Sequence, residues 1–303
     1  MKITQNIRRK CIQIAAFGLS NAHAGNLLTG KLYTGPWKNF CNPGLHCYSC
    51  PAASTACPIG ALQTVMGSFQ FDFSFYVVGF LMAVGVVLGR FVCGFLCPFG
   101  LIQELFHRLP LKKIRLPGWM KYIKYAVLAV TVFWPVLVTN YGVGDPFFCK
   151  FICPSGTLTG AVPLLLTDDA LHNAVGPMFL WKAALAVIIL ALCMVCYRFF
   201  CRVLCPLGAF YGLTNKVSLY RLKVDEAKCI HCGKCKQVCL MDVDPVLSPD
   251  SPECIRCGAC AQICPAGAIR LGFGIRKKEA ASPSPCSGHC KSCKGCGKSD
   301  IPT

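Results

Sequence analysis

Four long apolar stretches dominate the first two thirds of the chain: 11–28, 73–92, 122–139 and 179–200. The last three approach the roughly 20 residues that a helix needs to cross a bilayer. The first is weaker, because Asn21, His23 and Asn26 interrupt it, and the basic residues before it also suit a signal peptide. We expect four transmembrane helices, with the first stretch retained; its removal as a signal peptide is the alternative.

Lys and Arg are distributed unevenly between these stretches. They are concentrated in three segments: 1–10, 90–124 and 198–303. The loops 29–72 and 140–178 contain only Lys31, Lys38 and Lys150. Because positive residues favour the cytoplasmic side, we expect a multi-pass protein of the bacterial inner membrane with both termini in the cytoplasm and these two loops outside.

The composition narrows the class of protein. The 303 residues are 54% hydrophobic and 15% charged, with a mean hydropathy of +0.51, which is too apolar for a soluble domain of this size. The 25 cysteines admit disulfides, zinc sites or iron–sulfur clusters, and the prevailing Cys-x2-Cys spacing favours metal. The basic residues behind the net charge of +18 mostly flank apolar segments or cysteines, so we expect no nucleic-acid partner.

Two copies of one cysteine pattern follow the last apolar stretch. CIHCGKCKQVC (229–239) and CIRCGACAQIC (254–264) both read Cys-x2-Cys-x2-Cys-x3-Cys. In bacterial two-cluster ferredoxins, three cysteines of such a run hold one [4Fe–4S] cluster and the fourth ligates the other. The predicted sets are Cys229, Cys232, Cys235 and Cys264 for one cluster, and Cys254, Cys257, Cys260 and Cys239 for the other. Tandem zinc sites are the disfavoured alternative, and Leu240, where these ferredoxins usually have proline, predicts looser packing.

A shorter pattern, Cys-Pro-x-Gly, recurs in the apolar part at 57–60, 97–100, 153–156 and 205–208, alternating between the predicted outer and inner sides. RFVCGFLCPFG and RFFCRVLCPLG, around the two inner copies, predict a tandem repeat of a two-helix unit. Cysteines four residues apart share one face of a helix, which the following proline ends. We expect the inner copies to hold a [4Fe–4S] cluster at the cytoplasmic face through Cys93, Cys97, Cys201 and Cys205. Use of these cysteines as small buried apolar residues is the alternative.

The outer copies are less regular. FFCKFICPSG (147–156) has both cysteines, but in the matching block CNPGLHCYSCPAASTACPIG (41–60) Ala53 stands where the first would be. We expect an outer [4Fe–4S] cluster on Cys50, Cys57, Cys149 and Cys153, with Cys47 as the next candidate. Disulfides, alone or beside one cluster, are the alternative in an oxidising compartment. Cys193 and Cys196 lie within the fourth stretch, where packing is the more frequent role.

These patterns divide the chain into three parts. Residues 1–210 form a four-helix transmembrane domain, and residues 211–274 form a small α+β ferredoxin-like domain in the cytoplasm. Residues 275–303 are rich in Ser, Pro, Gly and Lys, which predicts a flexible tail. The tail carries four cysteines that form a metal site, with His289 as a spare ligand, or stay redox-labile thiols: Cys286, Cys290, Cys293 and Cys296.

The inner cysteine pairs followed by a two-cluster domain resemble the membrane polyferredoxin family of NapH-type and NosR-type proteins. The outer blocks resemble a four-span subgroup of 4Fe–4S proteins of anaerobic bacteria. The resemblance implies electron transfer between a quinol or cytoplasmic donor and an extracytoplasmic acceptor, which in some cases bears FMN. It also implies redox protein partners on one or both faces, a quinone as a further cofactor, and a role as subunit of a reductase or quinol dehydrogenase.

Two questions stay open in the sequence. A maturation or redox-regulatory protein that supports another reductase would carry the same cysteines. An electron conduit, in turn, must cross a hydrocarbon core of roughly 30 Å between the inner and outer sites, which is long for a single transfer.

Overall fold

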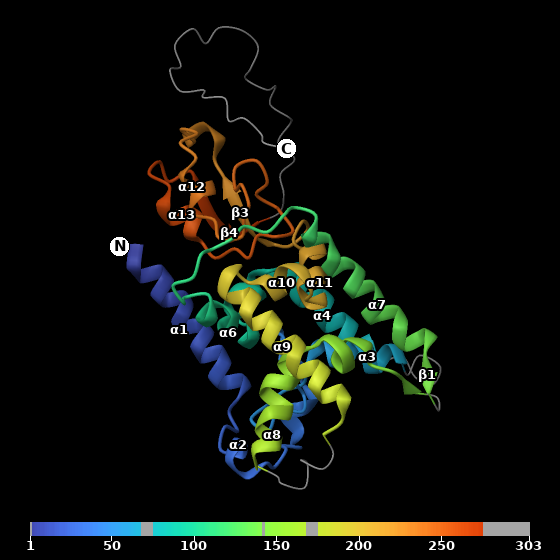
Figure 1. The fold of residues 1–303 in the computed structure, drawn as a ribbon. Helices are drawn as coiled ribbons and strands as arrows, with labels where there is room; N and C mark the ends of the chain where they lie inside the picture. Colours follow the sequence, from blue (N-terminus) through green and yellow to red (C-terminus); the bar gives the residue numbers. More distant parts are fainter. Residues whose placement is uncertain (1, 68–74, 141–142, 168–174, 275–303) are drawn as a thin grey trace, which may run out of the picture.

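The computed structural model describes residues 2–67, 75–140, 143–167 and 175–274 (Figure 1). The helices are α1 (Lys2–Ser20), α2 (Asn26–Thr29), α3 (Pro58–Gly67), α4 (Phe75–Leu88), α5 (Phe91–Phe95), α6 (Pro98–Phe106), α7 (Ile123–Leu137), α8 (Val162–Thr167), α9 (Pro177–Val195), α10 (Phe199–Val203), α11 (Pro206–Thr214), α12 (Lys234–Gln237) and α13 (Ala259–Ile263). Two π-helical segments, η3 (Phe148–Ile152) and η4 (Gly156–Ala161), precede α8, and short 3-10 turns are η1 (Pro36–Asn39), η2 (Met120–Tyr122) and η6 (Glu226–Lys228). The strands are β1 (Thr139–Asn140), β2 (Val143–Gly144), β3 (Tyr220–Val224) and β4 (Ile269–Phe273).

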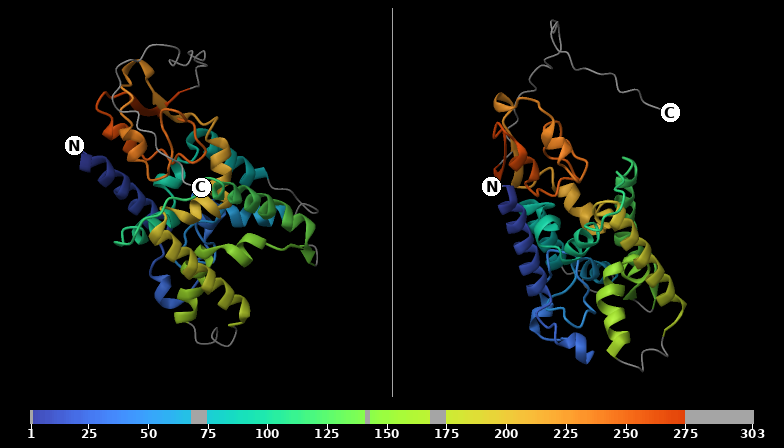
Figure 2. Two further views of the ribbon diagram at one scale, coloured as in Figure 1. Left: turned by 45° about the horizontal axis from the view of Figure 1, so that its top comes forward. Right: turned by 60° about the vertical axis from the view of Figure 1, so that its left-hand side comes forward.

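A helical body carries a small β-containing unit at one end. In Figure 1, α1 runs along one side of the body, α7 along the other, and α9 crosses between them. The chain after α11 forms the upper unit, against which the N-terminal end of α1 rests, as both views of Figure 2 agree. Helices α3 and α11 pack on α7, and α6 packs on α1 and α9.

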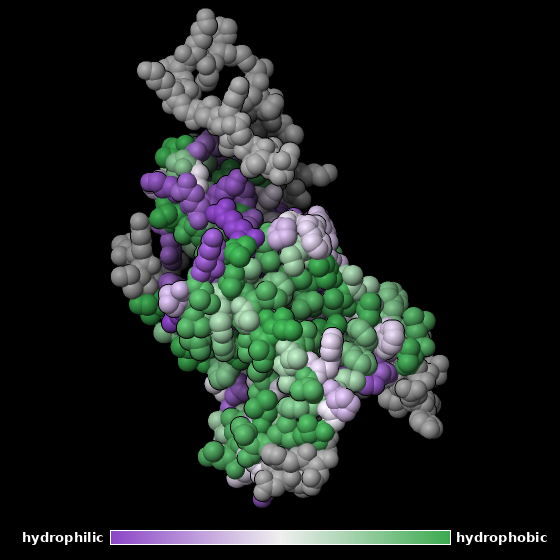
Figure 3. All heavy atoms as spheres, in the orientation of Figure 1, coloured by the Kyte–Doolittle hydropathy of each residue, from purple (hydrophilic) through white to green (hydrophobic). Residues whose placement is uncertain are grey.

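The surface of the body is mostly apolar, whereas the upper unit is more hydrophilic (Figure 3). Among the described residues, two helices are long and apolar enough to cross a membrane, Met120–Leu137 and Pro177–Val195. Large side chains on them are exposed, including Leu137 at 78% and Leu180 at 71%. Helix α4 is apolar but has 14 residues. The expectation of four spans is therefore supported at two places and stays a prediction at the other two.

Three of the expected apolar helices end earlier than the hydropathy pattern predicts. Residues 11–28 are split between α1 and α2 by a turn, and the second and fourth stretches stop at Leu88 and Val195. Each of these two ends is followed by a residue with positive φ, Gly89 at 55° and Arg198 at 50°. The buried Arg90 and Arg198 follow these two helix ends and donate to the backbone carbonyls of Cys201 and Cys93.

The upper unit is an α+β fold of the expected kind. Strands β3 and β4 pair antiparallel with Leu222 opposite Leu271, and α12 and α13 pack together beside them. Gly233 and Gly258 precede the two helices at φ of 71° and 82°, the left-handed region that favours glycine. The four tail cysteines, Cys286, Cys290, Cys293 and Cys296, lie outside the described residues.

Candidate iron–sulfur centres

The first ferredoxin-type set lines one cavity. Around a volume of about 230 Å³ lie all four predicted ligands, Cys229, Cys232, Cys235 and Cys264, with the backbone of Gly233 between them. The α12 loop brings three of these thiols to one side, and the start of the segment after α13 brings the fourth. The donor set and the space therefore fit a [4Fe–4S] group held by four thiolates.

The second set is also brought together. Burial raises the pKa of the Cys254 thiol to about 11, with smaller effects from neighbouring Cys257 and Cys239. Burial likewise raises the pKa of Cys260 to about 12, and the same three cysteines lie close enough to add to it. The structure thus places Cys239, the last cysteine of the first run, beside the cysteines of the second run, as the spacing predicts. Leu240 beside it is 58% exposed.

The four Cys-Pro-x-Gly motifs share one local structure, the start of a helix or helical segment. In α6 and α11 the proline is the first helical residue, and the cysteine before it is extended, at ψ of 115° and 114°. The Gly208 amide donates to Cys205 Sγ at 3.3 Å, and the matching glycine amide faces the sulfur in the other three motifs. A helix N-terminus favours negative charge, so each motif presents a sulfur suited to the thiolate form.

Glycine is required in these motifs by close packing. A Cβ on Gly100 would lie 3.1 Å from the carbonyl oxygen of Cys93, and one on Gly208 would lie 2.8 Å from that of Cys201. Each helix therefore packs directly against the backbone of the cysteine four residues before its own N-cap. The motif fixes both cysteines of a pair relative to each other.

The inner set is buried at the centre of the body. Cys93, Cys97, Cys201 and Cys205 are between 3% and 6% exposed and belong to one core cluster. Burial, together with the neighbouring thiols of Cys201 and Cys93, raises the pKa of the Cys97 thiol to about 12. Burial raises the pKa of Cys205 well above its ordinary value, again with Cys201, Cys93 and Cys97 as neighbours. The two repeats therefore bring these four thiols together, as the sequence predicted.

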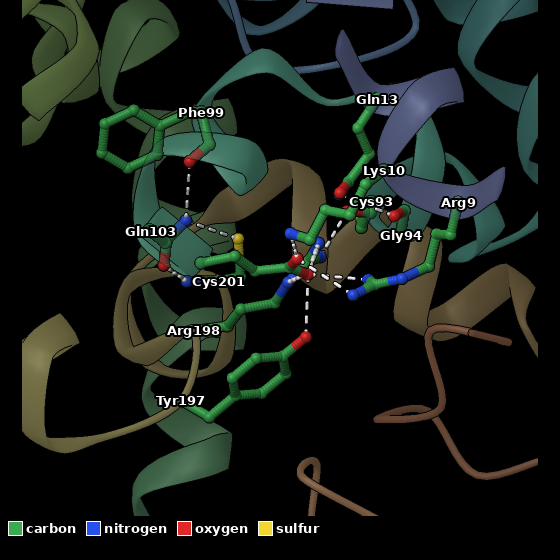
Figure 4. Close-up of polar contacts among 11 residues, drawn as sticks. Arg9, Lys10, Gln13, Cys93, Gly94, Phe99, Gln103, Tyr197, Arg198 and Cys201 are labelled. Carbon is green, nitrogen blue, oxygen red and sulfur yellow. Dashed lines mark hydrogen bonds and ion pairs between the residues drawn. The ribbon is translucent and has the colours of Figure 1, made fainter. Parts of the chain in front are cut away.

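Two buried arginines tie the repeats together across this set. Arg90 Nη2 donates to the carbonyl oxygen of Cys201 at 3.1 Å, and Arg198 Nη1 donates to that of Cys93. Arg198 also pairs with the Glu104 carboxylate, as do Arg9 and Lys10, and Figure 4 shows the side chains of these three basic residues converging. Burial opposes ionisation of Glu104, but Arg198 and Arg9 outweigh it and hold the pKa of that carboxyl well below its ordinary value.

The outer cysteines are also brought together, and Cys47 lies among them. Burial raises the pKa of Cys153, and the neighbouring thiols that raise it further are Cys149, Cys57 and Cys47. Cys47 Sγ also lies 3.5 Å from the position of a Cβ built on Gly160, inside the segment that follows Cys153. Cys50 packs with Ala52 and Ala53 beside Cys47, and its thiol faces Asn21 Oδ1 at 3.9 Å. The structure thus groups the next candidate, Cys47, with Cys57, Cys149 and Cys153.

The inner and outer sets adjoin instead of lying a membrane thickness apart. The loop after Cys41 folds into the body, where a Cβ on Gly44 would lie 2.7 Å from Cys97 Cα. The backbone amide of Leu45 faces the thiol of Cys97, and the next amide, of His46, faces that of Cys57. Since consecutive Cα atoms are about 3.8 Å apart, the two thiols lie within roughly 10 Å of each other.

The ferredoxin-type unit packs against the segment that carries the inner set. A Cβ on Gly94 would lie 2.7 Å from the carbonyl oxygen of Ile255, which follows Cys254 directly. Arg90 Nη1 donates to the Pro252 carbonyl at 2.7 Å and pairs with Glu253 at 2.8 Å, where Lys124 is a second partner of the carboxylate. One charged group therefore binds both the inner set and the second ferredoxin-type loop.

Cys193 lies beside Cys201 of the inner set without belonging to a predicted four-cysteine group. Cys193 is fully buried, and its thiol donates to Gln103 Oε1 at 3.6 Å. Within residues 2–67, 75–140, 143–167 and 175–274, no three His, Cys, Asp or Glu side chains are placed as ligands of a single metal ion. A cubane is a larger group than one ion and is held by four thiolates around its corners.

Residues that sequence patterns did not single out also contact these sets. The contacts of Leu45 and His46 cannot be predicted from the sequence, because nothing in their spacing distinguishes them from other loop residues. Gln63 and Gln103 donate to ligand-set sulfurs, and their signal was present, since each follows its Cys-Pro-x-Gly cysteine by six residues.

A 4Fe-4S binding domain family matches the chain over residues 54–76, 73–117, 126–166 and 178–224, which together make up half of it. These segments contain all four Cys-Pro-x-Gly motifs of the body. A second 4Fe-4S binding domain model matches residues 249–270, in the ferredoxin-type unit. The chain therefore belongs to the 4Fe-4S binding domain family.

Individual relatives agree with this membership. An uncharacterized protein of Methanocaldococcus jannaschii is 28% identical over 54% of this chain and 63% of its own length. The putative electron transport protein YccM of Escherichia coli is 24% identical, over 54% of this chain and 44% of its own. The ferredoxin-type protein NapH of Haemophilus influenzae is 30% identical, over 34% of this chain and 51% of its own length.

The chain thus spans about half the length of the curated relatives it matches. The predicted resemblance to the polyferredoxin-like family of NapH and NosR is confirmed. No solved structure matches the chain.

Proposed function

We propose that this 4Fe-4S protein is a membrane-bound electron carrier in which four [4Fe–4S] clusters are arranged in series. The ligand sets are the two of the ferredoxin-type unit, then Cys93, Cys97, Cys201 and Cys205, then Cys47, Cys57, Cys149 and Cys153. When bound, such a cluster accepts and donates one electron at a time. The proposal includes four spans in the inner membrane, with the ferredoxin-type unit in the cytoplasm.

The observation that carries the proposal is the pair of adjacent amides of Leu45 and His46, which face Cys97 and Cys57. These residues are 1% and 2% exposed, so the loop connects the two sets through the protein interior. Gly94 and Ile255 make a similar backbone contact between the inner set and the ferredoxin-type unit. Packed backbone therefore joins the ferredoxin-type unit to the inner set and the inner set to the outer set, which supports a continuous path.

The protein's own groups supply the charge balance that such a path needs. Glycine amides at the four helix starts face the ligand sulfurs, and Arg90 and Arg198 lie beside Cys93. Arginine stays positive in every protein environment, so both guanidiniums stabilise added negative charge on this set. The surrounding core keeps water away from it.

The donor side of the proposal is a cavity of about 460 Å³ between the body and the ferredoxin-type unit. Cys239 and Cys257 of the second set line it, together with His107, Tyr197 and Arg108. Its size and mixed lining suit an aromatic carrier such as a quinol, which gives up protons as well as electrons. A separate redox protein at the lysine-bearing surface near Cys232 is the second donor class, because Lys228, Lys234 and Lys236 suit an acidic partner. An FMN-bearing protein is the proposed acceptor beyond the outer set.

The test uses full-length protein purified without oxygen and placed in lipid nanodiscs. A quinol, or separately a reduced small ferredoxin, is mixed with it, and cluster reduction is followed by freeze-quench EPR. Reduction of the clusters on both the ferredoxin-type unit and the body within seconds supports the conduit. Reduction that stays confined to the ferredoxin-type unit would refute it and favour a maturation or regulatory role.

A further inference from the structure

The inner set receives a hydrogen bond from a side chain outside the cysteines. Gln103 in α6 is fully buried, and its Nε2 lies 3.0 Å from Cys201 Sγ. Figure 4 shows the carboxamide between the Phe99 carbonyl and the Cys201 sulfur. The Cys201 backbone amide donates to Gln103 Oε1 at 3.4 Å.

The outer set receives the same kind of bond. Gln63 in α3 is also fully buried, with Nε2 3.1 Å from Cys149 Sγ and 3.3 Å from the carbonyl oxygen of Ile59. The backbone amide of Phe148, next to Cys149, donates to Gln63 Oε1 at 2.9 Å. In both sites a glutamine from the first repeat reaches the first cysteine of the second repeat's pair.

The backbone fixes which end of each carboxamide faces the sulfur. A peptide N–H can only donate, so the oxygen of Gln63 must face Phe148 and the oxygen of Gln103 must face Cys201 N. The two hydrogens of each NH2 group then point to a backbone carbonyl four residues earlier and to the sulfur. Both glutamines are consequently donors to a ligand sulfur.

We propose that Gln63 and Gln103 set the reduction potentials of the outer and inner clusters separately. This inference rests on the proposed function, because it needs clusters in both sets. Reduction adds an electron to the iron–sulfur group, and a hydrogen bond to a ligand sulfur stabilises that added charge. Each glutamine therefore raises the potential of its own site, acting as a positioning residue through Cys149 or Cys201.

Each of the two sites in the body has one such glutamine donor. Glutamine follows the cysteine by six residues in the motifs at Cys57 and Cys97, whereas Thr159 and Tyr211 occupy that place in the second repeat. Removing one glutamine should therefore leave the other cluster with its donor. The two variants serve as controls for each other.

The test compares Gln103→Met and Gln63→Met in the full-length, anaerobically purified protein. Methionine keeps the length of the side chain and removes the donor. Gln103→Glu and Gln63→Glu are second variants that keep the planar shape and, when ionised, present only acceptors. Iron and sulfide are counted first, and each cluster's midpoint potential is then measured by redox titration with EPR.

With iron and sulfide unchanged, Gln103→Met should shift one midpoint to a lower potential, and Gln63→Met should shift a different one. Unchanged potentials, or the same cluster shifting in both variants, would overturn the inference. So would loss of the cluster in every variant of a site, because the glutamine would then be needed for assembly. Failure of the proposed function would appear earlier, as wild-type protein without clusters in the body.

Discussion

Arg90 Nη2 donates a hydrogen bond to the carbonyl oxygen of Cys201, 3.1 Å away in the other repeat, while Arg198 returns the contact to Cys93. The exchange is reciprocal, so each repeat's arginine holds the partner repeat's first cysteine. Arg90 also reaches Glu253, so the same side chain fixes the ferredoxin-type unit. Both arginines are fully buried, which makes these contacts costly to break.

Replacing Arg90 should therefore remove the inner cluster. In Arg90→Met the carbonyl of Cys201 and the carboxylate of Glu253 lose their buried donor, and we expect iron to fall by about four atoms per chain. Arg270→Met is the control, because Arg270 is exposed on β4. Full iron content and an unchanged EPR spectrum in Arg90→Met would contradict this role.

Glu104 should be a major stabilising group of the junction between α1, α6 and α10. Glu104→Gln leaves Arg198 without its buried carboxylate, and we expect the free energy of unfolding to fall by about 3–5 kcal/mol. Thermal and denaturant unfolding in detergent measures the change. The exposed Glu226→Gln should change stability by less than about 0.5 kcal/mol.

The pH dependence of that difference follows from the lowered pKa of Glu104. A carboxylate with a depressed folded pKa adds stability above its ordinary pKa of 4.5 and loses it as the pH falls through the folded value. Between about pH 5.5 and pH 8 the difference in free energy of unfolding between wild type and Glu104→Gln should therefore stay constant. A gap that closes within this range would show that Glu104 is protonated there.

Gly94 should control electron transfer between the ferredoxin-type unit and the inner set. Alanine at this position places a Cβ 2.7 Å from the Ile255 carbonyl oxygen, so the two segments must move apart. We expect Gly94→Ala to keep its iron but to pass electrons to the body clusters severalfold more slowly in freeze-quench EPR. Gly79→Ala is the matched control, because nothing lies within 4 Å of its Cβ. Equal rates in the two variants would exclude this contact from the path.

Cys47 and Cys50 offer a direct choice between two ligand assignments. Cys47→Ser should remove the outer cluster, whereas Cys50→Ser should keep it, because Cys47 and not Cys50 is among the thiols beside Cys153. Iron analysis and EPR of both variants show which of the two cysteines is a ligand of the outer cluster. Loss of the outer cluster only in Cys50→Ser would restore the assignment that spacing alone suggested.

Much of this arrangement could be predicted from the sequence where spacing is local. The two cysteine runs and the two inner Cys-Pro-x-Gly segments identify their sets, because a fixed spacing, or a repeat with its cysteines in register, determines which thiols face together. Hydropathy predicts α7 and α9 but overestimates the length of α4, the helix before Arg90. A hydropathy pattern carries no information about a buried arginine that needs backbone acceptors.

The remainder depended on tertiary contacts. The position of Cys47 beside Cys153 depends on how the loop after Cys41 folds, and Ala53 breaks the repeat that would have indicated a cysteine there. The same loop carries Leu45 and His46 into the body, so the expected gap of a full hydrocarbon core between the sites does not arise. No periodicity in a loop can predict that approach.

The iron and acid-labile sulfide content of the anaerobically purified full-length protein tests the central claim most directly. Four clusters in series predict about sixteen iron and sixteen sulfide atoms per chain, with about eight remaining when Cys93 and Cys149 are both replaced by serine. About eight in the wild type, with no loss in the double variant, would contradict clusters in the body and with them the conduit.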